Sequence, residues 1–315
     1  MTITERPAPV RSRISELLGV DYPIVQAPMG WIARSALASA VSNAGGLGII
    51  ETSSGELDAI RVEIKRMREL TDKPFGVNIA QLFVRDPTIV DFVVEQGVRF
   101  VTTSAGDPTK YTSKLKDAGL TVFHVVPTLA AALKAVDAGV DGLVVEGGEG
   151  GGFKNPRDVA TMVLVPLVRS RVSVPIIAAG GITDGYSMAA AFALGAEGVQ
   201  MGTRMVSAAE SPVHQNWKDA IVGAAETDTV FLNRFSRPGL RALRTERTER
   251  LERDEHVALT EMATAMDLYF GGDMEASIAL TGQVAGRIDA VRTARDIVES
   301  TVREFRERIA DLQGR

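Results

Sequence analysis

The chain alternates short apolar runs with longer amphipathic stretches, and this alternation constrains its fold more than any other feature. The longer stretches place apolar residues three and four positions apart, as in helices with one buried face. Repeated strand–helix units of this kind predict a parallel sheet. Eight units are the number that closes a (β/α)₈ TIM barrel, which is the α/β fold that we expect. The runs that we interpret as strands cover residues 24–27, 46–50, 75–78, 99–103, 121–126, 142–146, 175–179 and 198–201.

An open, doubly wound sheet is the competing fold. We prefer the barrel because glycine-rich turns follow strands throughout the chain, rather than one early crevice. After residue 201 the alternation stops, and residues 207–282 show helical patterns and loops punctuated by Pro212, Pro238 and a Gly271-Gly272 pair. Residues 283–312 are periodic like one long helix. We therefore expect a barrel built from residues 1–206 and 283–315, with a small helical insertion at 207–282 that acts as a lid over the carboxyl face.

Composition narrows the class of protein. The 35 lysine and arginine residues and 40 aspartate and glutamate residues give a net charge of −5, which argues against nucleic acid or an anionic membrane as the partner. The absence of cysteine excludes disulfides, thiolate metal sites and a cysteine nucleophile, and the spacing of the histidines suggests no metal site. The first residues lack the apolar core of a secretory signal, and no run of about 18 apolar residues occurs. We expect a cytoplasmic enzyme with a small-molecule substrate, and a homodimer is possible.

Two glycine turns follow neighbouring strands near the middle of the chain. One strand runs into Gly180 and Gly181, and the next runs into Gly202 and Thr203. Glycine has no Cβ, so its N–H can approach an anion, and the helix that follows adds the positive end of its dipole. Two such turns one unit apart predict a single phosphate at the carboxyl ends of adjacent strands. Two tight turns without a ligand are the alternative.

Six motifs in this order resemble the nitronate monooxygenase family, formerly called 2-nitropropane dioxygenases. They are QAPMG (26–30), NAGGLG (43–48), KPFGVN (73–78), EGGEGGG (146–152), IAAGGITDG (177–185) and LGAEGVQMGTR (194–204). The resemblance covers residues 18–204 and continues weakly beyond. The same superfamily includes flavin-dependent enoyl-ACP reductases, an NADH:quinone reductase and a reductase of steroid-ring degradation. The resemblance implies a TIM barrel with FMN lying across its carboxyl face.

The resemblance also implies which residues bind the flavin. Ala27, Pro28 and Met29 would contact the isoalloxazine ring, and Asn78 would bond its pyrimidine edge, for which an amide offers both a donor and an acceptor. Asn78 as a turn amide and Met29 as core filling are the alternatives. Glu146 would bond a ribityl hydroxyl or pair with a nearby lysine. The 5′-phosphate would lie on Gly180, Gly181, Gly202 and Thr203, and the other expected cofactor contacts are His124, Gly151, Ala179, Gln200 and Met201.

One position departs from the family pattern. Members usually carry a histidine after the glycines of the sixth strand's loop, where it acts as a base, and Phe153 stands there in this chain. Phenylalanine has no proton to move, so proton abstraction at this position is not expected; packing under the lid is the alternative role. Lys154 and Asn155 are candidates for orienting an anionic nitronate or an acyl carbonyl, unless they lie in a solvated loop. His124 is the other candidate for proton transfer, with a structural role as its alternative.

Three functions remain open from the sequence. The first is oxidation of an alkyl nitronate by O₂ through FMN, which needs no base if the nitronate is already formed. The second is an NAD(P)H-dependent flavin reductase of an enoyl or acyl thioester or of a quinone. The third is a catalytically weak flavin-binding protein whose partner is another subunit. The absence of an early G-x-G-x-x-G does not decide among them, because these reductases bind nicotinamide without it.

Overall fold

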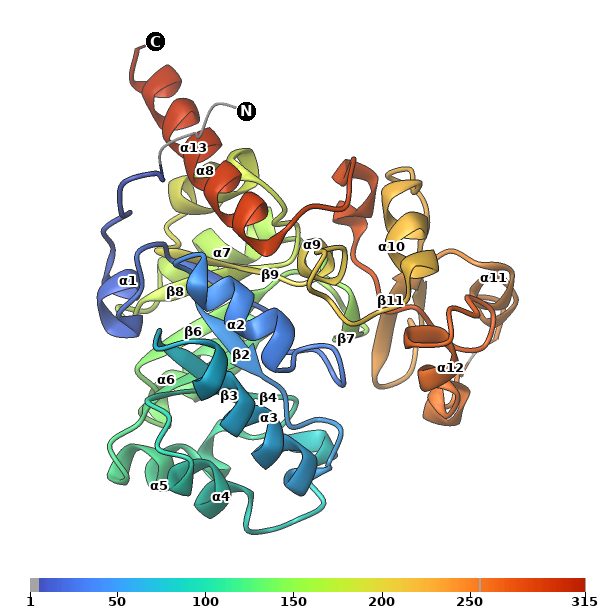
Figure 1. Ribbon diagram of the computed structural model, residues 1–315, viewed down its shortest axis with the longest axis horizontal. Coiled ribbons are helices and arrows are strands. Elements are labelled where there is room, and N and C mark those ends of the chain that lie inside the picture. Colours follow the sequence, from blue (N-terminus) through green and yellow to red (C-terminus); the bar gives the residue numbers. More distant parts are fainter. Residues whose placement is uncertain (1–5, 255, 315) are drawn as a thin grey trace.

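The eight expected strands form one parallel sheet that curls into a barrel (Figure 1). The computed structural model describes residues 6–254 and 256–314, so the first five residues of the charged N-terminal segment lie outside the described residues. Neighbouring strands follow the order β1-β9-β8-β6-β5-β4-β3-β2, and a parallel bridge between Val25 and Leu47 joins the two ends of the sheet. The predicted TIM barrel is thus confirmed. Its strands are β1 (Ile24–Gln26), β2 (Gly48–Ile50), β3 (Phe75–Ala80), β4 (Phe100–Ser104), β5 (Thr121–Val126), β6 (Gly142–Glu146), β8 (Ile176–Ala179) and β9 (Gly198–Met201).

Two apolar layers explain why the strands read as nearly continuous apolar runs. Side chains that point inward, such as Val25, Phe123 and Ile177, form a small cluster within the barrel. Side chains that point outward join a larger cluster with the helices. The short helix α1 (Arg13–Leu18), which the sequence analysis did not anticipate, packs Ile14 and Leu18 into the inner cluster before the first strand.

A ring of helices covers the barrel. The last of them, α13 (Ala294–Gln313), packs on α8 and α2 and so takes the place of the eighth helix. It begins later than expected, because residues 283–287 form the 3₁₀ turn η4 (Gln283–Arg287) and the Thr293 side chain caps the helix. The other helices are α2 (Ser35–Asn43), α3 (Leu57–Leu70), α4 (Ile89–Glu95), α5 (Thr112–Asp117), α6 (Leu129–Asp137), α7 (Thr161–Arg169), α8 (Gly185–Ala193) and α9 (Thr203–Val206), with 3₁₀ turns η1 (Gln81–Phe83) and η2 (Pro108–Lys110).

The insertion between β9 and α13 is not purely helical, and this part of the prediction is wrong. It holds α10 (Gln215–Val222), α11 (Glu246–Leu251), η3 (Leu259–Met262) and α12 (Ala265–Tyr269), but also a hairpin of β10 (Thr229–Leu232) and β11 (Gly239–Leu243). β11 pairs with β7 (Gly152–Lys154) from the loop after β6, so the insertion is hydrogen-bonded to the barrel's own loop. Two apolar runs separated by a turn that contains proline and glycine are a sequence signal for such a hairpin.

Two features are absent from the described residues, a membrane-spanning helix and a cluster of metal ligands. Among residues 6–254 and 256–314, no helix combines the length and apolarity needed to span a bilayer. Within the same ranges, no three His, Cys, Asp or Glu side chains gather closely enough to ligate a metal ion.

Candidate active site

A cavity of about 850 Å³ opens at the carboxyl ends of the strands, where a TIM barrel carries its active site. Met201, which was expected among the cofactor contacts, does not line it. Its side chain is fully buried between barrel and helices, because alternation along β9 turns it away from Gln200. The cavity brings together the other predicted residues: Ala27, Pro28, Met29, Asn78, His124, Glu146, Gly151, Phe153, Lys154, Asn155, Ala179, Gly180, Gly181, Gln200, Gly202 and Thr203.

The two glycine turns lie at one side of this cavity. Gly180 and Gly181 have φ of +84° and +79°, a conformation that glycine adopts without strain. A Cβ on Gly180 would lie 2.8 Å from the backbone oxygen of Gly147, so the loop after β6 packs directly on the turn. Across the turn, Thr203 Oγ1 accepts a hydrogen bond of 2.8 Å from the N–H of Gly282 in the insertion. The insertion therefore fixes the side chain that was expected to face a phosphate.

Two amide side chains approach the cavity from strand ends. The amide of Asn78 is held in place, because its Nδ2 donates to Thr102 Oγ1 at 2.9 Å. Gln200 differs, since its buried Oε1 has no hydrogen-bond partner among the described residues. A buried acceptor without a donor is costly. Gln200 lines the cavity, so a small rotation of its amide would present this orphaned oxygen to a ligand that donates a hydrogen bond.

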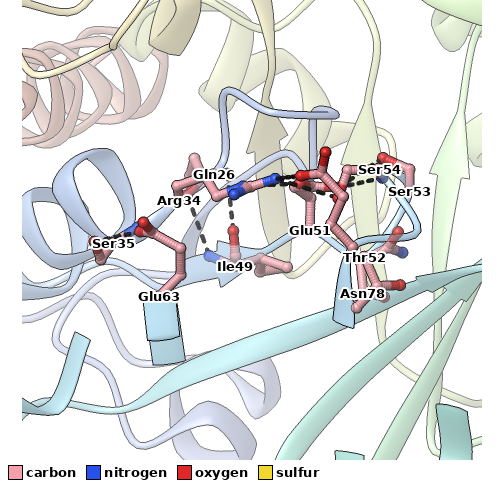
Figure 2. Close-up of polar contacts among 11 residues, drawn as sticks. Gln26, Arg34, Ser35, Ile49, Glu51, Thr52, Ser53, Ser54, Glu63 and Asn78 are labelled. Atoms are coloured by element: carbon pink, nitrogen blue, oxygen red, sulfur yellow. Dashed lines mark hydrogen bonds and ion pairs between the residues drawn. The ribbon is translucent and has the colours of Figure 1, made fainter. Parts of the chain in front are cut away.

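A buried ion pair orders the loops after β1 and β2, and sequence reasoning missed it. Glu51 is fully buried at the end of β2, and its carboxylate accepts bonds from Arg34 Nε at 3.0 Å and from Ser53 Oγ and the Ser54 N–H, both at 2.9 Å (Figure 2). The network places Ser53 on the cavity wall. Beside it, the Gln26 amide bonds both backbone groups of Ile49, which ties β1 to β2. The only sequence signal was an acidic residue directly after an apolar run.

His124 lies in the cavity wall but is occupied by structural bonds. Its Nδ1 lies 2.7 Å from Thr103 Oγ1, and the backbone of Gly106 provides a further hydrogen bond. Burial is the main cause that lowers the pKa of His124 to about 4, so the ring is neutral near pH 7. This geometry favours the structural role over that of a base.

The loop after β6 carries Phe153, at the position where the family pattern has a histidine, and its neighbours Lys154 and Asn155. Phe153 packs edge-to-face on Phe83, with ring centroids 5.2 Å apart. Lys154 Nζ lies 2.5 Å from Glu146 Oε1, so the pairing of Glu146 with a nearby lysine is what the structure shows. Asn155 makes a local turn bond to the Arg157 N–H. In the same loop, the carboxylate of Glu149 accepts from the backbone and hydroxyl of Thr161 and caps α7.

The insertion closes one side of the cavity with aromatic side chains that the sequence analysis did not single out. Trp217 and Tyr269 both line the cavity, with ring centroids 4.9 Å apart. Burial raises the pKa of Tyr269, whose hydroxyl therefore stays protonated. Arg237 and Pro238, from the turn of the hairpin, complete this side. The insertion thus contributes directly to the site.

Comparison with known proteins identifies the family. The sequence model described as nitronate monooxygenase matches residues 11–88 and 81–304, which is most of the chain. This chain belongs to the nitronate monooxygenase family. Family membership makes it an oxidoreductase, and a flavin is the cofactor that the family implies.

Proteins that are similar to this chain are named for different enzyme activities. The chain is 38% identical to (3aS,4S,5R,7aS)-5-hydroxy-7a-methyl-1-oxo-octahydro-1H-indene-4-carboxyl-CoA dehydrogenase of Mycobacterium tuberculosis, over 75% of this chain and 66% of that protein. It is 32% identical to the protein of the same name from Rhodococcus jostii, over 96% of this chain and 98% of the relative. The solved structure of FabK from Thermotoga maritima is 40% identical and covers 97% of this chain and 99% of its own, with a TM-score of 0.91.

The described residues fit a flavin mononucleotide. The residues of both glycine turns, at Gly180 and Gly202, line the cavity, and the start of a helix after a glycine turn suits a phosphate. Asn78 and the orphaned Oε1 of Gln200 offer polar groups suited to the N–H, carbonyl and hydroxyl groups of such a molecule. The fit rests on these observations together with the family.

Proposed function

We propose that this protein is an FMN-dependent oxidoreductase that exchanges a hydride between a nicotinamide and the acyl part of a thioester. The orphaned acceptor of Gln200 beside the glycine turns supports the cofactor. Bound FMN would supply hydride exchange with both partners. Gly180, Gly181 and Gly202 would hold its phosphate, while Asn78 and Gln200 would bond the rest of the molecule. Ala27, Pro28 and Met29 would form the wall beneath the ring.

One observation bears on the substrate class: no described residue of the cavity offers a free base, which counts against a neutral nitroalkane. A neutral nitroalkane must lose a proton before it can be oxidised. Phe153 cannot accept one, His124 is held by Thr103 and Gly106, and Glu146 is paired with Lys154. A thioester does not require such a base for hydride addition. The carboxyl-CoA dehydrogenases at 38% and 32% identity support this class independently.

Oxidation of a pre-formed alkyl nitronate by O₂ is the second candidate. The family model favours it, and the buried ammonium group of Lys154 suits an anionic substrate. This reaction needs no base in the protein, so Phe153 does not count against it. The two candidates differ in what reduces the flavin, which makes them easy to separate.

Anaerobic stopped-flow absorbance of the flavin separates the candidates. The thioester proposal predicts that NADH or NADPH bleaches the flavin and that an enoyl-CoA, such as crotonyl-CoA, restores its absorbance. Bleaching by propyl nitronate alone would replace it with the nitronate candidate. Bleaching by neither would indicate a catalytically weak flavin-binding protein. A purified protein that binds no FMN would overturn all three.

A further inference from the structure

Lys154 is a buried cation on the wall of the active-site cavity. Its side chain is only 4% exposed, whereas that of its partner Glu146 is 25% exposed. An ammonium group has three N–H donors. The structure shows one hydrogen bond from Nζ among the described residues, the 2.5 Å bond to Glu146 Oε1. Lys154 lines the cavity, and its other two N–H donors have no partner among the described residues.

The backbone around Lys154 is built to hold this ion pair. Lys154 lies on β7, opposite Gly239 of β11, so the strand cannot shift without breaking the small sheet. Gly150 packs over the pair, because a Cβ there would lie 2.9 Å from Lys154 Nζ and 3.0 Å from Glu146 Oε1. Any larger residue at position 150 would push the pair apart. Lys154 is therefore fixed at one point of the wall, in contrast to a mobile surface lysine.

The other charged groups of the surrounding loops have partners of their own. Glu149 caps α7 through Thr161. Arg241 of β11 donates to the backbone oxygen of Gly148 at 2.6 Å and lies 3.4 Å from Asp158. Two other cations line the cavity: Lys134, which pairs with Asp107 at 2.6 Å, and Arg237, which is exposed on the turn of the hairpin. Among the described lining residues, Lys154 is thus the lysine or arginine whose side chain is buried. It stands one residue after Phe153, the position at which the family pattern carries a base.

We propose that Lys154 binds the carbonyl oxygen of the thioester and stabilises the negative charge that develops on it, and that Glu146 positions Lys154 for this purpose. This inference rests on the function proposed above. In the direction of reduction, a hydride that originates from NAD(P)H forms a bond to the β-carbon. The π-electron pair moves to the carbonyl oxygen, where the N–H groups of Lys154 hold the enolate. The α-carbon then takes a proton from solvent, which yields the saturated thioester.

An ammonium group at this position acts without a proton transfer of its own. Charge-assisted hydrogen bonds are stronger than neutral ones, and they gain further in a site with little water. Removing one such donor from an oxyanion site typically slows the reaction by about 10²–10³-fold. Lys154 is thus a catalytic residue in this account, whereas Glu146 is a positioning residue. The apolar ring of Phe153 next to Lys154 keeps the local dielectric low, which strengthens the hydrogen bonds that the ammonium group donates.

The variant Lys154→Met tests the proposal by separating the two half-reactions. Reduction of the flavin by NAD(P)H does not involve the thioester, so its rate should match that of the wild type. Reoxidation by crotonyl-CoA should be slower by about 10²–10³-fold. Lys154→Arg keeps the positive charge and should retain part of the rate. In Glu146→Gln the amide oxygen still accepts a bond from Lys154 but holds it less firmly, so kcat should fall more than KM changes. Lys114→Met removes an equally charged lysine, paired with Asp91 at 2.6 Å on the outer helix ring, and should change neither half-reaction.

A second readout does not depend on turnover. Acetoacetyl-CoA forms an enolate that absorbs in the near ultraviolet, and a cation at its carbonyl oxygen favours the enolate. Difference spectra should show a larger enolate fraction on the wild-type holoenzyme than on Lys154→Met, when both are compared at equal FMN content and below the unfolding temperature of either protein. Equal enolate fractions, or reoxidation of Lys154→Met at the wild-type rate, would overturn the inference alone. A wild-type flavin that no thioester reoxidises would overturn the proposed function, and the inference with it.

Discussion

Three glycine-to-alanine variants measure how far the turn after β8 is specialised for a ligand. Gly119, Gly180 and Gly181 have nearly equal φ values of +80°, +84° and +79°. An L-residue in this region costs about 1–2 kcal/mol. A Cβ on Gly119 meets nothing within 4 Å, and one on Gly181 meets Glu149 Oε1 at 3.7 Å, so both variants carry only this conformational cost. A Cβ on Gly180 would lie 2.8 Å from Gly147 O and 3.2 Å from two backbone nitrogens, and such overpacking adds about 1–3 kcal/mol.

Urea unfolding of the apoprotein gives the free energy of unfolding of each variant, and fluorescence titration gives its affinity for FMN. The free energy of unfolding should fall by about 1–2 kcal/mol for Gly119→Ala and Gly181→Ala, and by about 2–5 kcal/mol for Gly180→Ala. Gly119→Ala should bind FMN like the wild type, because Gly119 is not among the residues that line the cavity. Gly180→Ala and Gly181→Ala should bind at least about tenfold more weakly, a loss of about 1.4 kcal/mol. Gly180→Ala with the stability of Gly119→Ala, or with wild-type affinity for FMN, would refute this reasoning.

Three further predictions follow from single side chains. The pKa of His124 lies near 4 in the folded protein and near 6.5 when unfolded, so the unfolded chain binds the proton first and the fold should lose about 3 kcal/mol as the pH falls from 6.5 to 4; urea unfolding across this range should show a flatter profile for His124→Gln, and an equally steep one would contradict the assignment. Gln200→Leu should leave the apoprotein as stable as the wild type or more so, because it removes an unsatisfied oxygen, yet equilibrium titration should show weaker FMN binding; tighter binding would be inconsistent with a ligand-facing amide. Phe153→His should add turnover of neutral nitroalkanes, measured by oxygen uptake, and no gain would mean that the alignment of position 153 with the family's base, or the role given to that base, is wrong.

Much of the fold could be predicted because its signal is local. Each barrel strand is buried on both faces, so the sequence shows it as an apolar run, and β5, β6 and β9 begin and end at the predicted residues. The hairpin of the insertion escaped prediction for the opposite reason. One of its pairing partners is β7, whose sequence Gly-Phe-Lys lies inside a glycine-rich loop far away in the chain. A contact between segments so distant leaves no periodic pattern in either.

Some residues of the candidate site could likewise be predicted from the sequence, and others could not. Residues at strand ends, such as Asn78 and Gln200, could be predicted because a parallel barrel gathers those ends at one face. Trp217 and Tyr269 could not, since their place in the wall depends on how the insertion folds back. Whether His124 is free or bonded depends on Thr103, which lies on the neighbouring strand and is brought close only by register. The structure thus adds the partners of each side chain, which decide its chemistry.

In the proposed function, the glycine turns hold the phosphate of FMN at the carboxyl face of the barrel. Equilibrium titration of the apoprotein with FMN and with riboflavin, which lacks the phosphate, tests it most directly. Charge-assisted hydrogen bonds contribute about 1.5–3 kcal/mol each, so two of them predict that FMN binds at least about a hundredfold more tightly than riboflavin. Equal affinity for the two flavins would contradict the account.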